Sequence, residues 1–426
     1  SGRRVVLATN IAETSLTVPG VTAVVDGGLV KQVRCDPRTG LDRLEQGPAS
    51  HHSADQRAGR AGRTAPGRVL RLWTAHEHRG RPLADRPEIQ RVDPASWLCA
   101  LLAFQPGDPH GFSFLDPPGD EALGAGIALL RRLGALPRQG FALPARGKRL
   151  AKLPVHPRVG CLLQRAAEKG LAREGALLAA LIEERDLLEH PPGETIDSDL
   201  LDRAERFGQL EREGSADGCA HRLGLRPAAV RAVRDARDQL IRLVARQKRD
   251  GDGAPSRDAL LSLPLAGFPD RVCRRRRPGA PEAVMVGGRG VRLADDSGVR
   301  EAELFLALEA DAGRRGAHAV SLVRVASAVS EEMLAEAFPR LFSEEEDAVF
   351  DPEREAVIGI RRRHFDDLVL DEQEGVPVDP VRVAAVLAEA AVQRFGRVLR
   401  PGREARPLRA PPSQRRWHPY RGLHDR

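Results

Sequence analysis

The stretch SADQRAGRAGR, residues 53–63, decides how the rest of the chain is interpreted. It places Arg57, Arg60 and Arg63 three residues apart, with a glycine directly before each of the last two. Arginine stays protonated, and its planar guanidinium can donate two parallel hydrogen bonds to a phosphate. Because residues three or four apart share a face at the start of a helix, Gln56, Arg60 and Arg63 can face one ligand. The stretch therefore predicts a polyphosphate-binding face, and the simpler alternative is the solvated start of a basic helix.

A second stretch, ATNIAETSLT at residues 8–17, decides between these alternatives. It follows residues 4–8, a short apolar run typical of a strand buried on both faces of a parallel sheet. Ligands of such sheets bind at the carboxyl ends of the strands, so polar residues after this run are placed to act. Residues 8–17 and 53–63 resemble motifs V and VI of the DEAH-box branch of superfamily 2 helicases. The resemblance is specific because both strings match and occur in the family's order.

The resemblance implies a nucleotide site. Gln56, Arg60 and Arg63 would face ATP, bound with Mg²⁺ between two lobes, and Arg60 and Arg63 would be the catalytic residues at the γ-phosphate. Prepositioned positive charge meets the charge on the transferring phosphoryl group, and an arginine finger is worth about 10³–10⁵ in rate. Thr17 would belong to the nucleotide-binding residues. The family often has an acidic residue where this chain has Pro19, so an acidic contact to the nucleotide is not expected there.

The same resemblance implies a site for a nucleic acid strand. Thr9 and Asn10 would hold its backbone phosphates, and the hydroxyl residues that follow would link this grip to the nucleotide. Hydroxyl groups near strand ends also commonly serve only as helix caps. Residues 30–44 alternate around the turn DPRTG and predict a β-hairpin. In the family a hairpin at this place wedges against the duplex, with Arg34 and Arg38 expected at the strand, and an ordinary edge hairpin is the alternative.

The motifs that would complete an ATPase are not in the sequence. It contains neither Gly-x-x-x-x-Gly-Lys-Ser/Thr nor a DEAH box. The string DEAL at residues 120–123 stands at a predicted helix start rather than after a buried strand, so it is not that box. We therefore expect the first RecA-like lobe, with the Mg²⁺ ligands, to precede Ser1, and we expect this fragment alone not to hydrolyse ATP.

The expected fold class is multidomain α/β plus α. The predicted domains are the C-terminal part of a second RecA-like lobe (1–93), a winged helix (94–147), a helical bundle or ratchet (148–250), an OB-like β domain (261–345), an HrpB-type C-terminal α+β region (346–396) and a disordered basic tail (397–426). Apolar periodicity predicts helices at 122–136, 157–169, 173–185, 197–213, 227–249, 331–341 and 380–397. Strands are predicted at 21–25, 67–73, 141–143, 284–286, 291–293, 304–308 and 320–325, and a hairpin-like segment at 349–370.

The segment LAGFPDRVCRRRR, residues 265–277, resembles the bacterial HrpB-type DEAH helicases. The OB-like domain expected around it is a fold that commonly binds single strands. The four successive arginines at 274–277 therefore have two interpretations. They could contact nucleic acid, or they could form an ordinary solvated surface.

Composition limits the class of protein. The chain has 426 residues and a formal net charge of +7, which permits nucleic acid binding without requiring it. Lysine and arginine total 67, and nearly all of them are arginine, which suits phosphate recognition but also follows from a G+C-rich genome. The five cysteines lack a Cys-x-x-Cys pair, so we expect free thiols and a cytoplasmic protein. The pairs His51/His52 and His76/His78 lack a third ligand, so no metal site is predicted. No apolar run reaches the ~18 residues of a membrane span.

The sequence as a whole indicates the C-terminal part of an ATP-dependent, HrpB-type DEAH-box RNA helicase that acts on single strands. Two alternatives remain open. One is a truncated nucleic-acid-binding module without ATPase activity, and the other is a DNA helicase of the same superfamily, because backbone and stacking contacts tolerate either nucleic acid.

Overall fold

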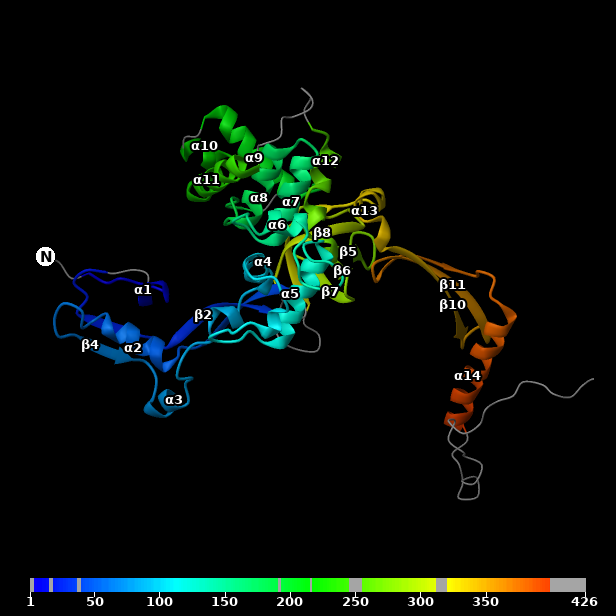
Figure 1. The fold of residues 1–426 in the computed structure, drawn as a ribbon, viewed down its shortest axis with the longest axis horizontal. Coiled ribbons are helices and arrows are strands. Elements are labelled where there is room, and N and C mark those ends of the chain that lie inside the picture. The colour runs from blue at the N-terminus through cyan, green and yellow to red at the C-terminus, as the bar shows by residue number, and fades with distance from the viewer. Residues whose placement is uncertain are drawn as a thin grey trace, which may run out of the picture. The chain divides into compact units, whose positions relative to one another are not determined.

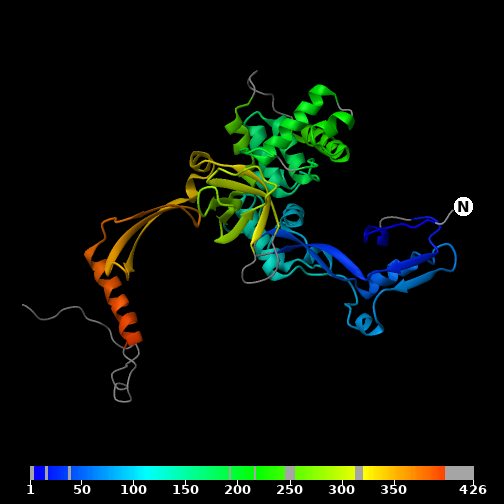
Figure 2. The ribbon, with the colours of Figure 1, turned by 180° about the vertical axis from the view of Figure 1, so that it is seen from behind.

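A computed structural model describes residues 4–14, 18–36, 40–190, 193–214, 217–244, 255–311 and 320–398. The chain divides into two compact units, Ser1–Pro339 and Arg340–Arg426, and each is described by itself (Figures 1 and 2). Among the described residues no helix is long and apolar enough to cross a membrane.

The first region of unit 1 holds a two-stranded parallel sheet. Strand β1 (Ala23–Asp26) pairs with β4 (Arg68–Arg71). Both overlap segments predicted as strands, 21–25 and 67–73. Around the sheet lie three short helices, α1 (Ile11–Thr14), α2 (His51–Gly59) and α3 (Ala75–Arg79). The start of α3 is a capping box, in which the hydroxyl of Thr74 accepts from the Glu77 backbone and the Glu77 carboxylate accepts from the Thr74 backbone.

The predicted strand at residues 4–8 is wrong. The backbone there is irregular, and Val5 and Leu7 are 86% and 95% exposed. A strand is buried on both faces only where neighbouring strands pair with it and helices cover it. In the described part of the chain, the parallel sheet consists of β1 and β4 and offers residues 4–8 no paired neighbour.

The predicted hairpin is confirmed. Strands β2 (Leu29–Asp36) and β3 (Leu41–Pro48) pair antiparallel, while the turn residues 37–39 lie outside the described part. Leu41, next to the tip, is fully buried and packs in a core cluster with residues of a β-barrel far along the chain. Arg271 also donates to the carbonyl of Gly40 at 2.8 Å. The tip of the hairpin is therefore anchored in the barrel.

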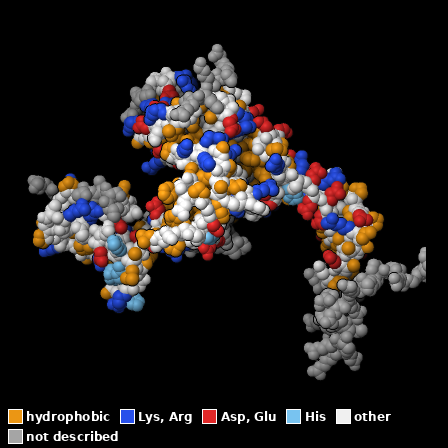
Figure 3. Space-filling view, viewed as in Figure 1, with side chains coloured by type: hydrophobic (Ala, Val, Ile, Leu, Met, Phe, Trp, Pro, Cys, Tyr) orange, Lys and Arg blue, Asp and Glu red, His pale blue; other side chains and the backbone are white. Residues whose placement is uncertain are grey.

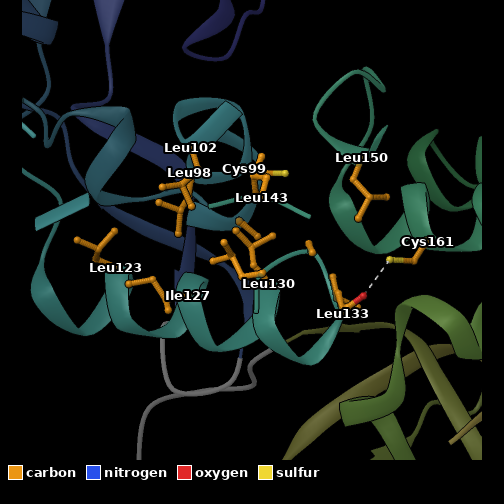
Figure 4. Packing of buried hydrophobic residues seen from close by; sticks show 13 residues of the cluster. Leu98, Cys99, Leu102, Leu123, Ile127, Leu130, Leu133, Leu143, Leu150 and Cys161 are labelled. Atoms are coloured by element: carbon orange, nitrogen blue, oxygen red, sulfur yellow. Dashed lines mark hydrogen bonds between the residues drawn. The ribbon is translucent and has the colours of Figure 1, made fainter. Parts of the chain in front are cut away.

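A helical region follows the hairpin. Asp93 caps α4 by accepting from Ala95 N at 2.7 Å, and Pro94 occupies its first turn, where a missing N–H costs nothing. The elements are η1 (Glu88–Gln90), α4 (Pro94–Phe104), η2 (Pro109–Gly111), α5 (Asp120–Arg132) and α6 (Ala145–Leu150). Their core is a cluster of leucines with two cysteines, and Cys161 Sγ lies 3.9 Å from the Leu133 carbonyl oxygen (Figure 4). The strand predicted at 141–143 is wrong, because the backbone there has no partner strand among the described residues.

The helical bundle agrees closely with the periodicity of the sequence. Its helices are α7 (Pro157–Glu168), α8 (Ala172–Glu183), α9 (Asp199–Glu213), α10 (Asp217–Arg222), α11 (Pro227–Val244) and α12 (Arg257–Ser262). The Asp199 carboxylate at the start of α9 accepts from Ser297 Oγ, Gly298 N and Ala326 N at 2.6–2.9 Å. The bundle is thereby joined to the barrel through a buried carboxylate whose three acceptor bonds offset its desolvation.

Five strands form the barrel. They are β5 (Val272–Arg275), β6 (Glu282–Met285), β7 (Arg289–Leu293), β8 (Leu304–Asp311) and β9 (Ser321–Ala328), with η3 (Pro264–Gly267) and η4 (Pro269–Arg271) before them and α13 (Glu331–Ala337) and η5 (Pro339–Leu341) after them. They pair in the order β8-β5-β6-β7-β9, and β8 also pairs with β9, so the sheet closes on itself. The β7–β9 pair is parallel and the other pairs of the barrel are antiparallel.

Strand β5 was not predicted, because its arginines were interpreted as a charged run. Its residues alternate, as in any strand, so successive side chains point to opposite faces. Arg274 pairs with Glu303 at the surface, whereas Arg275 is buried and donates to the carbonyls of Ala302 and Val299 at 2.6 Å. The arginine run therefore lies partly inside the barrel and is not wholly a solvated surface.

Unit 2 is a three-stranded antiparallel sheet followed by a helix. Its elements are β10 (Phe342–Asp351), β11 (Ala356–Phe365), β12 (Leu368–Glu374) and α14 (Pro380–Val398), which confirms the predicted hairpin and helix. Arginines of β11 pair with carboxylates of both neighbours, Arg361 with Glu346 at 2.7 Å and Arg362 with Glu372 at 2.5 Å. Figure 3 shows acidic and basic side chains side by side over these strands. Residues 340–398 carry fourteen acidic and eight basic side chains, so this part is acidic although the chain is basic.

Candidate functional site

The arginine stretch lies at the end of a helix, not at its start as the sequence suggested. Ser50 caps α2 by accepting from Ser53 N, three residues before the stretch begins, and the helix ends at Gly59. Arg60 is the C-cap, and Arg63 follows in a turn. Glycine is a poor helix former, and a cation is favoured at a helix C-terminus, so both features fit an end rather than a beginning.

Arg57 is the most highly connected residue of the site. Its Nε donates to Glu13 Oε2 at 3.0 Å, and its Nη1 donates to Asp26 Oδ1 at 3.0 Å and to the Leu29 carbonyl at 3.1 Å. The three partners lie in α1, at the end of β1 and at the start of β2. Burial alone would lower the pKa of Arg57, but the hydrogen bonds and charges of Glu13 and Asp26 outweigh it and raise the pKa above its ordinary value. The guanidinium is a permanent cation that joins three segments.

Arg60 reaches the same helix as Arg57. Its Nε donates to the carbonyl of Glu13 at 2.8 Å, and its Nη2 contacts the same oxygen. The segment that resembles motif V and the segment that resembles motif VI are thus in direct contact, and Figures 1 and 2 show α1 beside α2.

The other two predicted nucleotide residues of α2 and its turn lie at the surface. Gln56 is exposed, and its amide nitrogen is 3.0 Å from His52 Nε2. Arg63 is exposed in the turn after the helix. That turn is held by a close approach, since a Cβ at Gly67 would lie 2.2 Å from the Ala61 carbonyl oxygen. Exposed amide and guanidinium donors are suited to phosphate oxygens.

The predicted strand-binding residues are described only in part. Thr9 and Asn10 are exposed, and their carbonyls accept from Ala12 N and Glu13 N at 3.2 and 3.0 Å, which begins α1. Arg34 lies within β2, where it is 3.7 Å from Glu45, so it is part of a surface ion pair rather than of the α1–α2 contact. Thr17 and Arg38 lie outside the described residues.

The donor set was tested against the two groups that the resemblance implies. Gln56, Arg60 and Arg63 supply hydrogen-bond donors of the kind that phosphate oxygens accept, so they fit a nucleotide. Within the described ranges no group of three or more His, Cys, Asp or Glu side chains could hold a metal ion. By their chemistry, these three side chains suit phosphate oxygens rather than a metal ion.

Sequence reasoning missed the acidic partners of the site. Arg57 donates to the carboxylates of Glu13 and Asp26, and the Ser53 hydroxyl donates to Glu13 Oε2 at 2.5 Å. A signal existed, because Asp26 directly ends an apolar strand and Glu13 lies inside the motif-like string. Spacing alone identified a shared helix face but not the opposite charges that meet it.

The start of the chain matches a known domain family. Residues 1–65 match the family model "Helicase conserved C-terminal domain". The chain is 32% identical over 288 residues to the pre-mRNA-splicing factor ATP-dependent RNA helicase prp22 of Schizosaccharomyces pombe, which covers 64% of this chain and 25% of that protein. It is 36% identical over 217 residues to the ATP-dependent RNA helicase HrpA of Escherichia coli, covering 50% and 16%.

A solved structure extends the similarity over nearly the whole chain. The crystal structure of the DExH-box NTPase HrpB of E. coli matches with a TM-score of 0.69 and 27% identity, covering 94% of this chain and 45% of that one. The chain spans a quarter or less of the two curated relatives and under half of the solved structure. The fold is a helicase C-terminal RecA-like fold of mixed α/β content. The chain is therefore homologous to the C-terminal part of DEAH-box helicases, with HrpB as its structural counterpart.

Proposed function

We propose that the chain forms the arginine side of the ATP site and much of the strand channel of an ATP-dependent, HrpB-type DEAH-box RNA helicase. The observation that carries this proposal is the contact of Arg60 with the Glu13 carbonyl. It brings the helix expected to face ATP against the loop expected to hold the strand. We choose RNA rather than DNA as the substrate because the relatives prp22 and HrpA are named ATP-dependent RNA helicases.

In this proposal Arg60 and Arg63 are the catalytic residues. Arg63, exposed after the helix, meets the γ-phosphate, and the Arg60 guanidinium exchanges the Glu13 carbonyl for a phosphate oxygen. A neutral carbonyl is a weaker partner for a guanidinium than a phosphate, which carries the opposite charge and can accept two parallel hydrogen bonds. Gln56 and Thr17 bind the nucleotide beside them.

The strand is held by Thr9 and Asn10, with Arg34 and Arg38 contributing from the hairpin. Both Thr9 and Asn10 are exposed at the start of α1, where polar groups can reach backbone phosphates. The winged-helix, ratchet and OB-like domains form the rest of the channel. Support for the OB-like domain comes from the barrel itself, whose five strands close in a single sheet.

The test is strand binding and ATP turnover by this chain. Fluorescence anisotropy with a labelled single-stranded RNA should give saturable binding, and the logarithm of its association constant should fall linearly with the logarithm of the salt concentration, with a slope of about −0.7 per phosphate contacted. Asn10→Ala should weaken binding about ten-fold, the value of one hydrogen bond to a charged group. Arg362→Gln, which breaks an ion pair in unit 2, is the matched control and should bind as the parent does.

ATP turnover separates the alternatives. Because the sequence has no phosphate loop, we expect no hydrolysis by this chain with or without RNA. RNA-stimulated turnover that Arg63→Ala abolishes would show that a catalytic phosphate loop lies within these residues. Tighter binding of DNA than of RNA of the same sequence would favour a DNA helicase, and no saturable binding to either nucleic acid would refute the proposal.

A further inference from the structure

We propose that Arg57 is a positioning residue that makes the strand-binding loop, residues 9–14, and the arginine-bearing end of α2 move as one body. The inference rests on the proposed function and assigns a role to a residue that touches neither ligand in it. Through this body, occupancy of the strand site is transmitted to Arg60 and Arg63.

The contacts centre on Glu13. Its carboxylate accepts from Ser53 Oγ at 2.5 Å and from Arg57 Nε at 3.0 Å, and its carbonyl accepts from Arg60 Nε at 2.8 Å. One residue of the loop is therefore bonded to three residues of α2 and its cap. The same Arg57 guanidinium reaches Asp26, whose other bond is to Gly28 N at 2.8 Å.

Burial makes these bonds strong. The side chains of Arg57, Glu13 and Asp26 are 14%, 15% and 4% exposed. Exposed ion pairs contribute about 0–1 kcal/mol, but removing one partner of a buried pair leaves an uncompensated charge and costs several-fold more. Loss of Arg57 would leave the carboxylates of Glu13 and Asp26 without the cation that they share.

The loop has little else to fix it against α2. Helix α1 is only four residues long, and its one large apolar side chain, Ile11, is 60% exposed. A helix without a buried apolar face is not held by hydrophobic packing. Its position therefore depends on the polar bonds of Glu13. A strand that displaces Thr9 or Asn10 displaces Glu13 with them, and with it the carbonyl that holds Arg60.

Such coupling is a free energy shared between two sites, so it must act in both directions. Nucleotide phosphates that draw Arg60 away from Glu13 would remove one of the bonds that hold the loop, and a strand that fixes the loop would fix Arg60. Arg57 retains the loop on α2 in either case, because its bonds to Glu13 and Asp26 do not involve Arg60.

Hydrogen exchange with the full chain, with and without a saturating single-stranded RNA, tests the inference. In the parent chain RNA should slow exchange both in residues 9–14 and in α2 and the following turn. In Arg57→Gln, RNA should still slow exchange in residues 9–14, but its effect on α2 should fall at least about five-fold, the lower end of usual coupling. Arg57→Lys keeps the cation and should restore part of the effect.

Two further variants complete the design. Glu13→Gln keeps the backbone bond to Arg60 but removes the charge that Arg57 meets, so it should behave as Arg57→Gln does. Arg362→Gln is the control and should leave the response of α2 unchanged. Unchanged exchange in the barrel strands confirms that each variant is folded.

The outcomes separate the two proposals. If the parent chain fails to bind RNA, the proposed function fails. If it binds RNA and α2 shows no response, or if the response survives in both Arg57→Gln and Glu13→Gln, the role assigned to Arg57 is wrong while the proposed function stands.

Discussion

Replacing Leu41 by alanine tests whether the hairpin tip belongs to the barrel core in solution. Leu41 is fully buried and packs in the cluster that contains Cys273 and Phe305, although more than 200 residues of sequence separate them. Leu44 lies three residues further along the same strand and is 61% exposed. The two leucines therefore form a matched pair that differs in burial and shares the hairpin.

The expected magnitude follows from that burial. Removing a leucine side chain from water contributes about 1.5–3 kcal/mol, and the cavity left by its truncation adds to this, so buried Leu→Ala changes cost about 2–5 kcal/mol. The tip of a hairpin can relax partly into the space, so we expect about 3 kcal/mol for Leu41→Ala. Leu44→Ala should change stability by no more than about 0.5 kcal/mol.

The assay is hydrogen exchange of the barrel strands, because a chain with several domains does not unfold in two states and global denaturation would average over them. A loss of about 3 kcal/mol speeds exchange through unfolding about a hundred-fold. We expect this in β5 and β8 for Leu41→Ala and no change for Leu44→Ala. Equal exchange in the two variants would refute the anchoring of the tip.

Two further predictions concern buried ionisable groups. Arg158→Met should cost about 3–5 kcal/mol, measured by hydrogen exchange in α7 and β5, because the Asp270 carboxylate, held at 2.6 and 2.7 Å, would remain without this partner. Burial alone would raise the pKa of Asp270, but the charge and hydrogen bonds of Arg158 hold that pKa well below its usual range. The stability that the Arg158–Asp270 pair contributes is therefore complete above about pH 4 and is lost as pH falls through the folded-state pKa of Asp270. Asp270→Asn should flatten the acid limb of the stability curve, and an unchanged limb would contradict the assignment. Burial raises the pKa of Cys35 to about 12 and of Cys99 to about 11, so mass spectrometry should find neither alkylated by iodoacetamide at pH 8 until the chain is unfolded.

The helices of the bundle could be predicted from the sequence because their cores are built from local periodicity. The prediction for 157–169 matches α7 (Pro157–Glu168) to one residue, and that for 173–185 matches α8 (Ala172–Glu183) within two. Strand β5 could not be predicted in this way. The guanidinium of buried Arg275 donates to carbonyls of the loop between β7 and β8, and residue type gives no sign of such distant acceptors.

The candidate site could also be predicted only in part. The motif-like strings identified the two segments and the arginines Arg60 and Arg63, and the structure brings the segments together. The Arg57–Glu13–Asp26 contacts could not be predicted, because they depend on how α1, α2 and β1 approach one another in space. The predicted buried strand at residues 4–8 was wrong because an apolar run shows what a strand could bury but not whether a neighbour covers it.

The acidic character of residues 340–398 has a consequence for where nucleic acid can adhere. Phosphates are repelled by a surface with an excess of carboxylates, and this repulsion acts over about 8 Å at physiological ionic strength. The arginines of β11 do not reverse it, because carboxylates of β10 and β12 already neutralise Arg361 and Arg362. In a basic chain, an acidic stretch of this kind lowers the number of places at which a polyanion can bind non-productively. For the strand binding proposed above, the favoured sites are then the basic residues elsewhere in the chain, and a rise in salt should weaken this discrimination along with binding itself.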